Sequence, residues 1–253
     1  MAVIRWHHPS QVLRLQTSLI LTLPEPETMN PCCPLLYLLH GGTENATTWL
    51  RETAIEALSQ QYGMVTVSID GLNSAYVNMR HGGKYFTYLT EELPAFLRRH
   101  LSLSSSKRMI GGFSMGGQGA LRAALRRPEL YDACFALSGA RDTVPLFRQW
   151  AAMENGPDLS GVEDALGPVE EMRASEDDLV TAARNAARRN FPLPALYLAC
   201  AEDDYAASLS QAFHEMMLSI GLNHQYFQSP GIHDYRFAEK ALRWALKDFL
   251  GRR

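Results

Sequence analysis

The stretch Gly112-Phe113-Ser114-Met115-Gly116 decides the fold, because it joins two segments of different character. The apolar run 108–113 predicts a buried strand, and residues 118–127 predict a helix. A sharp turn between strand and helix holds its central residue in a strained conformation and lifts that side chain above the sheet. Glycines at 112 and 116 remove the side chains that would collide where strand and helix meet. Ser114 is therefore predicted to project its hydroxyl from the end of a buried strand.

Strand and helix signals alternate along the rest of the chain. Continuous or alternating apolar runs predict strands, and apolar residues at helical spacing predict helices. Pro94 should kink or split the helix that contains it, because proline lacks a backbone N–H. The alternation predicts an α/β fold, with a mostly parallel central sheet and helices on both faces. The expected strands are 2–6, 16–23, 35–39, 64–69, 133–137, 195–199 and 224–228, and the expected helices are 50–62, 86–100, 209–220 and 235–250.

Residues 141–192 interrupt this alternation and carry no strand signal. They predict a short helix at 144–153, a loop rich in Gly, Pro and Asp, and a helix at 176–189 that starts at a capping box of Ser175 and Asp178. An insertion above the carboxyl ends of the strands usually forms a lid or one wall of a pocket. A helical decoration without a binding role is the alternative. We expect the 253-residue chain to form a single domain with this insertion as a small helical cap.

Composition excludes several classes of function. The net charge is −3, and no block of Lys and Arg or basic amphipathic helix points to nucleic acid or a membrane surface. No run reaches 18 apolar residues, and the N-terminus has no apolar signal core. We expect a cytoplasmic protein with reduced thiols and no metal, because no C-x-x-C spacing occurs among the cysteines, which are Cys32, Cys33, Cys134 and Cys200.

Functional groups follow the expected strands at the edge where the carboxyl ends of parallel strands meet. The groups are His40-Gly41-Gly42, Ser114, the pair Asp203 and Asp204, and His233. The order serine, acid, histidine is typical of a fold that holds its nucleophile on a strand-turn-helix elbow. Ser114 alone is a weak nucleophile and needs a base within hydrogen-bond reach. The pattern predicts a Ser-His-Asp arrangement. The alternative is a tight glycine turn whose serine has no catalytic role.

The base is best assigned to His233. Three histidines follow the acid loop, but His214 falls inside an expected helix and His224 opens an expected strand, so both are expected at the surface. His233 lies in a strand-to-helix loop behind Pro230-Gly231, which can shape a turn.

The acid is favoured at Asp204, with Asp203 as the alternative and Glu202 as a distant third. Adjacent side chains cannot point the same way, so one aspartate can orient His233 while the other caps the following helix.

Acyl transfer also needs N–H donors aimed at the developing oxyanion. The backbone N–H of Met115, at the start of the elbow helix, is one candidate, and the N–H of Gly42 is the other. A plain Gly-Gly turn is the alternative reading of residues 41–42.

Taken together, these stretches resemble the esterase D-like branch of the α/β-hydrolases, and most closely its tributyrin-esterase group. The resemblance implies a cofactor-free carboxylesterase, with the nucleophile on Ser114, the acid on Asp204, the base on His233 and the oxyanion donors on Gly42 and Met115. In similar proteins the acid loop often reads Cys-Gly-x-x-Asp, and Ala201 replaces that glycine, which leaves the choice between Asp203 and Asp204 open. The matching stretches are 35–42 with Trp49-Leu50, 91–94, 111–117, 200–205 and 231–234.

The sequence hypothesis is a serine carboxylesterase that hydrolyses short-chain acyl esters, including acetylated or feruloylated sugars, through an acyl-enzyme. Its partner is a small-molecule ester, and a homo-oligomer is compatible with the resemblance because relatives commonly assemble. An acyltransferase related to the mycolyltransferases and a thioesterase of the S-formylglutathione hydrolase type are the alternatives within the fold. A catalytically silent binding module is the alternative from another class.

Overall fold

The computed structural model describes residues 1–25, 33–101, 107–155, 158–189 and 191–251. Within these residues, eight strands form one sheet in the order β1-β2-β4-β3-β5-β6-β7-β8. β2 pairs antiparallel with β1 and β4, and every other neighbouring pair is parallel, as the alternation predicts. The strands are β1 (Ala2–Ser10), β2 (Leu15–Leu23), β3 (Leu35–Leu39), β4 (Val65–Ile69), β5 (Arg108–Phe113), β6 (Ala133–Leu137), β7 (Ala195–Ala201) and β8 (Gln225–Ser229).

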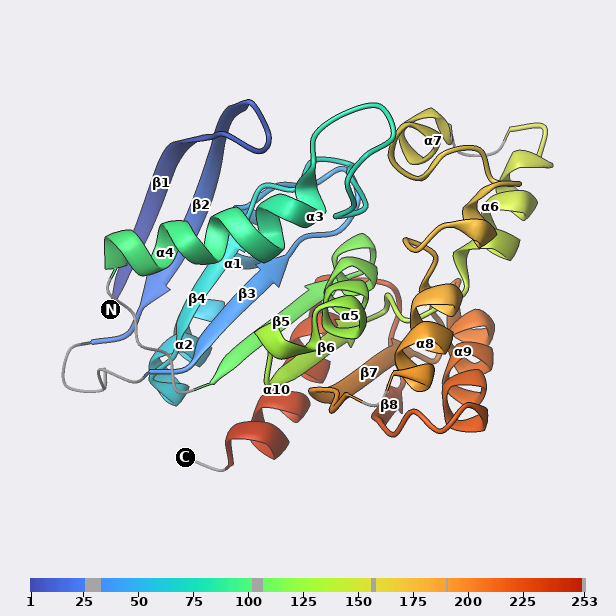
Figure 1. Cartoon of the computed structure of the whole chain (residues 1–253). Helices are drawn as coiled ribbons and strands as arrows, with labels where there is room; N and C mark the ends of the chain where they lie inside the picture. The colour runs from blue at the N-terminus through green and yellow to red at the C-terminus, as the bar shows by residue number, and fades with distance from the viewer. Residues whose placement is uncertain (26–32, 102–106, 156–157, 190, 252–253) are drawn as a thin grey trace.

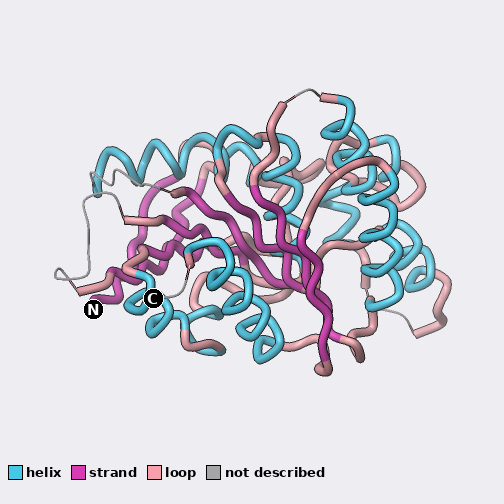
Figure 2. The backbone as a smooth tube through the Cα atoms, turned by 90° about the horizontal axis from the view of Figure 1, so that it is seen from below, coloured by secondary structure: helices cyan, strands magenta, loops and turns pink. Residues whose placement is uncertain are grey.

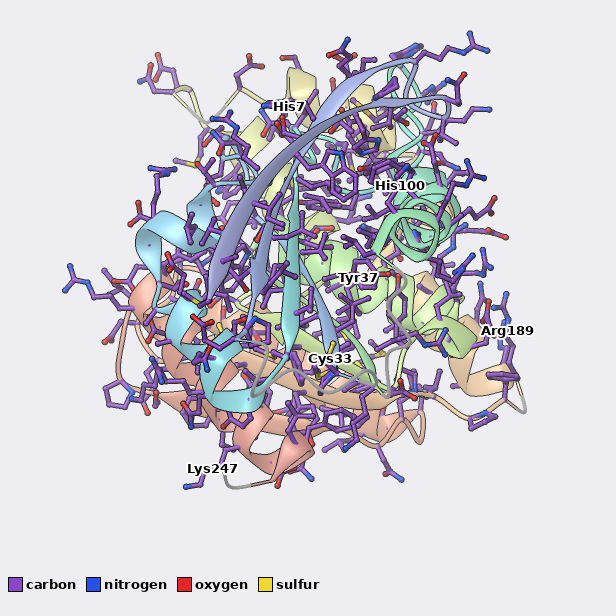
Figure 3. The ribbon with its side chains drawn as sticks, turned by 90° about the vertical axis from the view of Figure 1, so that its left-hand side faces the viewer. His7, Cys33, Tyr37, His100, Arg189 and Lys247 are labelled. Atoms are coloured by element: carbon purple, nitrogen blue, oxygen red, sulfur yellow. The ribbon has the colours of Figure 1, made fainter. Side chains whose placement is uncertain are left out.

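Helices cover both faces of the sheet. Along the fully buried strand β3, Leu35, Tyr37 and Leu39 pack into one apolar cluster, and Leu36 and Leu38 pack into the other. Figure 2 shows the strands as a layer between helices, and Figure 3 shows α4 with His100 and α10 with Lys247 on opposite sides of it. The first face is covered by α4 (Leu93–Leu101), α5 (Met115–Arg126), α8 (Leu179–Arg188) and α9 (Ala207–Ser219), and the second by α1 (Thr48–Glu52), α2 (Ile55–Tyr62) and α10 (Tyr235–Leu250).

Two expected helices are divided. The helix expected at 50–62 breaks between α1 and α2, because the N–H of Ala54 donates to Glu239 Oε2 on α10 at 2.8 Å rather than to a helical carbonyl. The helix expected at 86–100 consists of α3 (Tyr85–Thr87), a π-helical turn η1 (Tyr88–Glu92) and α4. The wider turn immediately precedes Pro94, which has no N–H to continue the regular ladder. The helix is therefore irregular next to this proline, where the sequence predicts a kink or a split, but it continues through Pro94 without a break.

The insertion between β6 and β7 is helical, as expected. It contains α6 (Thr143–Ala151), α7 (Ser160–Leu166), a 3₁₀ turn η3 (Met172–Ala174) and α8. α7 lies where the sequence predicts only a loop. In Figure 1, α6 and α7 lie beyond the ends of the strands toward which the arrows of β3 and β5 point.

The predicted start of the last helix of the insertion is wrong in detail. Asp178 is the N-cap of α8 and accepts a hydrogen bond from the N–H of Thr181 at 2.9 Å. Ser175 instead accepts from the N–H of Asp177 at 3.1 Å, in the turn before the helix. The helix therefore begins at Leu179 rather than at residue 176, because the aspartate and not the serine caps it.

The turn between β5 and α5 has the strained geometry that its glycines predict. Ser114 has φ 53° and ψ −115°, a conformation that costs about 1–3 kcal/mol for a non-glycine residue. A Cβ on Gly116 would lie 2.2 Å from Leu39 O, and one on Gly112 would lie 2.3 Å from the Gly116 carbonyl. α5 begins at Met115, directly after the turn.

No helix in the described ranges is both long and apolar enough to cross a bilayer.

We expect Gly116→Ala to lower the free energy of unfolding by about 3 kcal/mol or more, because the added methyl group would overlap backbone atoms that cannot move independently. Chemical denaturation measures the change. Gly161→Ala in α7 is the matched control, because nothing lies within 4 Å of its added Cβ. That substitution should leave stability unchanged or raise it by about 0.5–1 kcal/mol. Equal stabilities of the two variants would contradict the close backbone contact at Gly116.

Candidate active site

Four loops that carry predicted site residues leave the same edge of the sheet. β3 is followed by residues 40–42, β5 by Ser114, β7 by the loop containing Asp204, and β8 by the loop containing His233. The chain leaves β3 for β4 on one side and returns as β5 on the other. Loops diverge at such a point, and open α/β sheets bind their ligands in the crevice that results.

Ser114, His233 and Asp204 form a continuous hydrogen-bonded row. Ser114 Oγ lies 2.9 Å from His233 Nε2, and His233 Nδ1 lies 2.6 Å from Asp204 Oδ2. An ionised carboxylate only accepts, so Nδ1 carries the imidazole proton and Nε2 is left to accept the serine O–H. The row can therefore move the hydroxyl proton onto the imidazole as the oxygen attacks an electrophile.

Asp204, and not Asp203, contacts the imidazole. The Asp204 side chain is completely buried, and its second oxygen, Oδ1, accepts from the N–H of Ala206 at 2.9 Å. Burial alone would raise the pKa of Asp204, but the hydrogen bonds from His233 and Ala206 outweigh it, so the pKa lies below its usual range. Asp203 is exposed. The expectation that the other aspartate caps the next helix is wrong, because no side chain caps α9 at its N-cap, Ala206.

Two aromatic rings pack against the imidazole of His233. The ring centroids of Phe113 and Tyr205 each lie 4.7 Å from that of His233. Phe113 is the residue before Ser114 and Tyr205 is the residue after Asp204. The elements that supply the hydroxyl and the carboxylate therefore also restrict the orientation of the imidazole.

Among the described residues, the two backbone N–H groups predicted as oxyanion donors lack the hydrogen-bond acceptors that the neighbouring N–H of Gly41 has. The N–H of Gly41 is engaged by Glu44 Oε2 at 2.8 Å and by the Tyr235 hydroxyl at 3.3 Å. For the N–H of Gly42, the described residues provide no acceptor. Met115 stands in the first turn of α5, where N–H groups have no partner within the helix. The amides of Gly42 and Met115 are thus available to an oxygen atom bound beside Ser114.

His40, Glu44 and Tyr235 support the loop after β3, and the sequence does not predict these roles. His40 is fully buried; its Nδ1 lies 2.6 Å from Gly41 O, and its Nε2 accepts from the N–H of Gly71 at 2.9 Å. Burial lowers the pKa of His40 and keeps the ring neutral. The Tyr235 hydroxyl donates to Glu44. His40 directly follows β3 and Tyr235 lies two residues after His233, so their positions near site loops are a sequence signal for these contacts. Glu44 has no comparable signal.

Two cavities meet at Ser114 and Gly42. The first, of about 560 Å³, is lined by His233 and by the start of α10, and we call it the histidine cavity. The second, of about 620 Å³, lies under the insertion, and we call it the cap cavity. Its lining includes Met115, Gln118, Arg141, Phe147, Trp150, Asp158, Val162, Leu166 and Tyr205. An ester held at Ser114 can therefore extend one arm into each cavity.

Several aromatic and histidine residues near these loops in the sequence lie outside this site. Trp49 and Tyr76 are fully buried in the core. His214 and His224 contact each other, with 2.7 Å between Nδ1 and Nε2, and both are partly buried. No group of three or more His, Cys, Asp or Glu side chains that could hold a metal ion is found in the described part of the chain.

Comparisons with known proteins give one consistent relationship. A family model described as "Putative esterase" matches residues 10–236. The chain is 25% identical over 263 residues to an acetyl esterase of Caldicellulosiruptor saccharolyticus, covering 98% of this chain and 99% of that protein. The structure of substrate-bound FphF, a fluorophosphonate-binding serine hydrolase of Staphylococcus aureus, matches with a TM-score of 0.88 and 25% identity, covering 99% and 98% of the two chains. The S-formylglutathione hydrolase FrmB of Staphylococcus aureus matches with a TM-score of 0.84 and 24% identity, covering 99% of each chain.

The neutral state of His40 should make stability depend on pH. Its folded pKa is lowered, so the unfolded chain binds more protons, and stability falls as pH drops below about 6.5. We expect His40→Gln to reduce the slope of unfolding free energy between pH 7 and pH 5 by up to about 1.4 kcal/mol per pH unit. Denaturant titrations across this range measure the slope. Part of it should remain, because burial also lowers the pKa of His8 and His224.

The matched control is His81→Gln, which removes an exposed histidine from the surface. This variant should keep the slope of the unmodified protein. An unchanged slope in His40→Gln would mean that His40 is not held neutral by the fold.

Proposed function

Because the chain belongs to the esterase family whose model spans residues 10–236, we propose that it is a serine carboxylesterase that hydrolyses short-chain acyl esters. The observation that carries the proposal is the row from Ser114 through His233 to Asp204, with contacts of 2.9 Å and 2.6 Å. The likeness to an acetyl esterase supports a short acyl group.

In the proposed reaction, Ser114 Oγ attacks the ester carbonyl carbon while His233 Nε2 takes the hydroxyl proton. Asp204 stabilises the imidazolium that forms and fixes its tautomer. His233 then gives the proton to the leaving alcohol oxygen as the carbon–oxygen bond breaks, which leaves an acyl-enzyme on Ser114. Water then attacks the acyl-enzyme in the same way. His233 removes the proton of the attacking water and gives that proton to Ser114 Oγ as the carboxylic acid departs.

The carbonyl oxygen gains negative charge in both attacks. We propose that the N–H groups of Gly42 and Met115 donate to that oxygen. The neighbouring amide of Gly41 already donates to Glu44 and Tyr235, which supports Gly42 as the donor from this loop. Glu44 and Tyr235 act as positioning residues, because their contacts with the N–H of Gly41 restrain the loop that carries Gly42.

The remaining features of the proposal concern the whole chain. We propose one catalytic domain in which the insertion 141–192 acts as a cap, supported by Phe147 and Trp150 in the wall of the cap cavity. A cytoplasmic location is supported by the buried free thiols of Cys134 and Cys200, which suit a reducing compartment. Assembly into a homo-oligomer, and the absence of nucleic-acid and membrane partners, stay predictions from the sequence.

Loss of the serine hydroxyl should abolish turnover. We expect Ser114→Ala to lower kcat for p-nitrophenyl acetate by about 10⁶-fold, since removing a nucleophile of this type removes the covalent route. A fluorophosphonate probe should label the unmodified protein and not the variant. Retention of more than a few per cent of activity by the folded variant would exclude the acyl-enzyme mechanism.

A pair of adjacent substitutions tests the role of the acid. We expect Asp204→Asn to lower kcat by about 10⁴-fold, because the amide would favour the wrong imidazole tautomer. Asp203→Asn is the matched control and should keep nearly full activity, because Asp203 is exposed and makes no described side-chain contact with His233. Steady-state kinetics on p-nitrophenyl acetate separates the two. A larger loss in Asp203→Asn than in Asp204→Asn would overturn the assignment.

A further inference from the structure

Arg141 is a buried cation in the wall of the cap cavity. It lies between the end of β6 and the start of α6, and it is only 4% exposed. It lines the same cavity as Ser114, so it faces the space that an ester bound at Ser114 would enter. The row of Ser114, His233 and Asp204 does not use it.

No carboxylate pairs with Arg141 in the described part of the chain. The adjacent Asp142 turns away and binds Arg173, with 2.6 Å between Oδ2 and Nη2. Asp204 is occupied by His233 and by the N–H of Ala206. Asp158 also lines the cavity, but it is exposed and accepts from Ser160 N and Oγ at 2.9 and 3.0 Å. The positive charge of Arg141 is therefore not balanced by a contacting acid.

The hydrogen bonds of Arg141 are also incomplete. Its Nη1 donates to Ser138 O, and its Nη2 lies 3.3 Å from the Tyr205 hydroxyl. The guanidinium carbon lies 5.5 Å from the centroid of the Tyr205 ring. Nε is buried and has no hydrogen-bond partner in the described residues. A guanidinium offers five N–H donors, so this side chain keeps capacity for another acceptor.

Arg122 shows how a structural buried arginine differs in the same protein. It is 2% exposed, and its Nε and Nη1 donate to Asp177 O at 2.6 Å and to Ala75 O at 2.7 Å. These bonds tie α5 to the insertion and to the loop after β4, and Arg122 lines neither of the two cavities at Ser114. Arg141 lacks such a set of carbonyl partners and borders a cavity instead.

A buried charge without a partner is unfavourable, and buried charges in proteins are normally paired. A carboxylate from a ligand would relieve this, because arginine binds carboxylates through charge-assisted, often bidentate hydrogen bonds. Most of the remaining wall is apolar, with Phe147, Trp150, Val162 and Leu166. The cavity thus combines an apolar surface for a short chain with one cationic group.

The position of His233 indicates which arm of the ester enters the cap cavity. In the proposed mechanism His233 protonates the leaving alcohol, so that arm must lie on its side. His233 lines the histidine cavity and not the cap cavity. The acyl arm therefore extends under the cap toward Arg141.

We propose that Arg141 binds a carboxylate at the far end of the acyl group, so that the preferred substrates are half-esters of short dicarboxylic acids. This inference rests on the proposed function. Arg141 is here a specificity-determining residue, and the reaction at the ester carbonyl is the one already described.

The test compares ethyl esters that differ only in the distal group. Monoethyl succinate, glutarate and adipate are each measured against the ethyl ester that carries a terminal carboxamide in place of the carboxylate, with ethanol release as a common readout. At pH 7, kcat/KM for the carboxylate ester of the best length should exceed that of its amide partner by about 10- to 100-fold, as expected for a hydrogen bond to a charged group. Arg141→Met should bring this ratio close to one.

Two further variants separate charge recognition from structure. Arg141→Lys should keep part of the preference, because it keeps the charge but loses the planar fork. Arg148→Met is the matched control: it removes an exposed arginine of α6 that does not line the cavity, and it should keep the full ratio. Labelling of Ser114 by a fluorophosphonate probe checks that each variant has a folded site. If Arg141→Met is not labelled, the ratio of kcat/KM between the carboxylate ester and its amide partner is read in Arg141→Lys instead. A reduced ratio supports the inference, and an unchanged ratio contradicts it.

A second ester pair tests the arm assignment. With 3-acetoxypropanoate and 3-acetoxypropanamide the charge lies on the leaving alcohol, and no preference is expected. The inference is overturned if the unmodified protein labels and turns over esters but shows no preference for an acyl carboxylate. It is also overturned if the preference survives Arg141→Met or appears only on the alcohol arm. If the unmodified protein neither labels nor hydrolyses any ester, the proposed function itself falls.

Discussion

The close contact of three backbone segments, at the ends of β3 and β5 and at the first turn of α5, is the constraint on which the site depends. A Cβ on Gly116 would lie 2.2 Å from Leu39 O, and one on Gly112 would lie 2.3 Å from the Gly116 carbonyl. Only glycine permits such an approach. The contact holds Ser114 at φ 53° and brings the first N–H groups of α5 beside the loop after β3. The direction of the hydroxyl and the placement of both available amides thus have one origin.

The loop after β8 connects the imidazole of His233 to the loop after β3. It carries His233, and two residues later Tyr235 donates to Glu44, whose carboxylate also accepts from the N–H of Gly41. One short segment therefore orients the imidazole and restrains the loop that carries Gly42. Phe113 packs against both His233 and Tyr235, with ring centroids 4.7 Å apart in each pair, which fixes the segment to the end of β5. A shift of any one of these loops would disturb the other two.

The sequence predicts the features that depend on local pattern. The mostly parallel sheet, the glycine-framed turn at Ser114 and the esterase relationship are confirmed, the last by the family match over residues 10–236. Features set by distant contacts were not predictable. The break after α1 depends on Glu239 of α10, and the choice between two adjacent aspartates depends on which way each side chain turns. Glu44 and Tyr235 are 191 residues apart in the sequence, and no periodic sequence pattern predicts their contact.

The unfavourable groups around Ser114 differ in how far the protein itself offsets them. The strain at Ser114 is offset by dense backbone packing, and the buried charge of Asp204 by hydrogen bonds from His233 and Ala206. Arg141 has a carbonyl, a phenol and an aromatic ring, but no anion. The row on the sheet edge is complete without a ligand, whereas the wall under the cap is not. In the proposed function, the sheet edge supplies the reacting groups, and Arg141, at the start of the insertion, supplies a contact that the substrate completes.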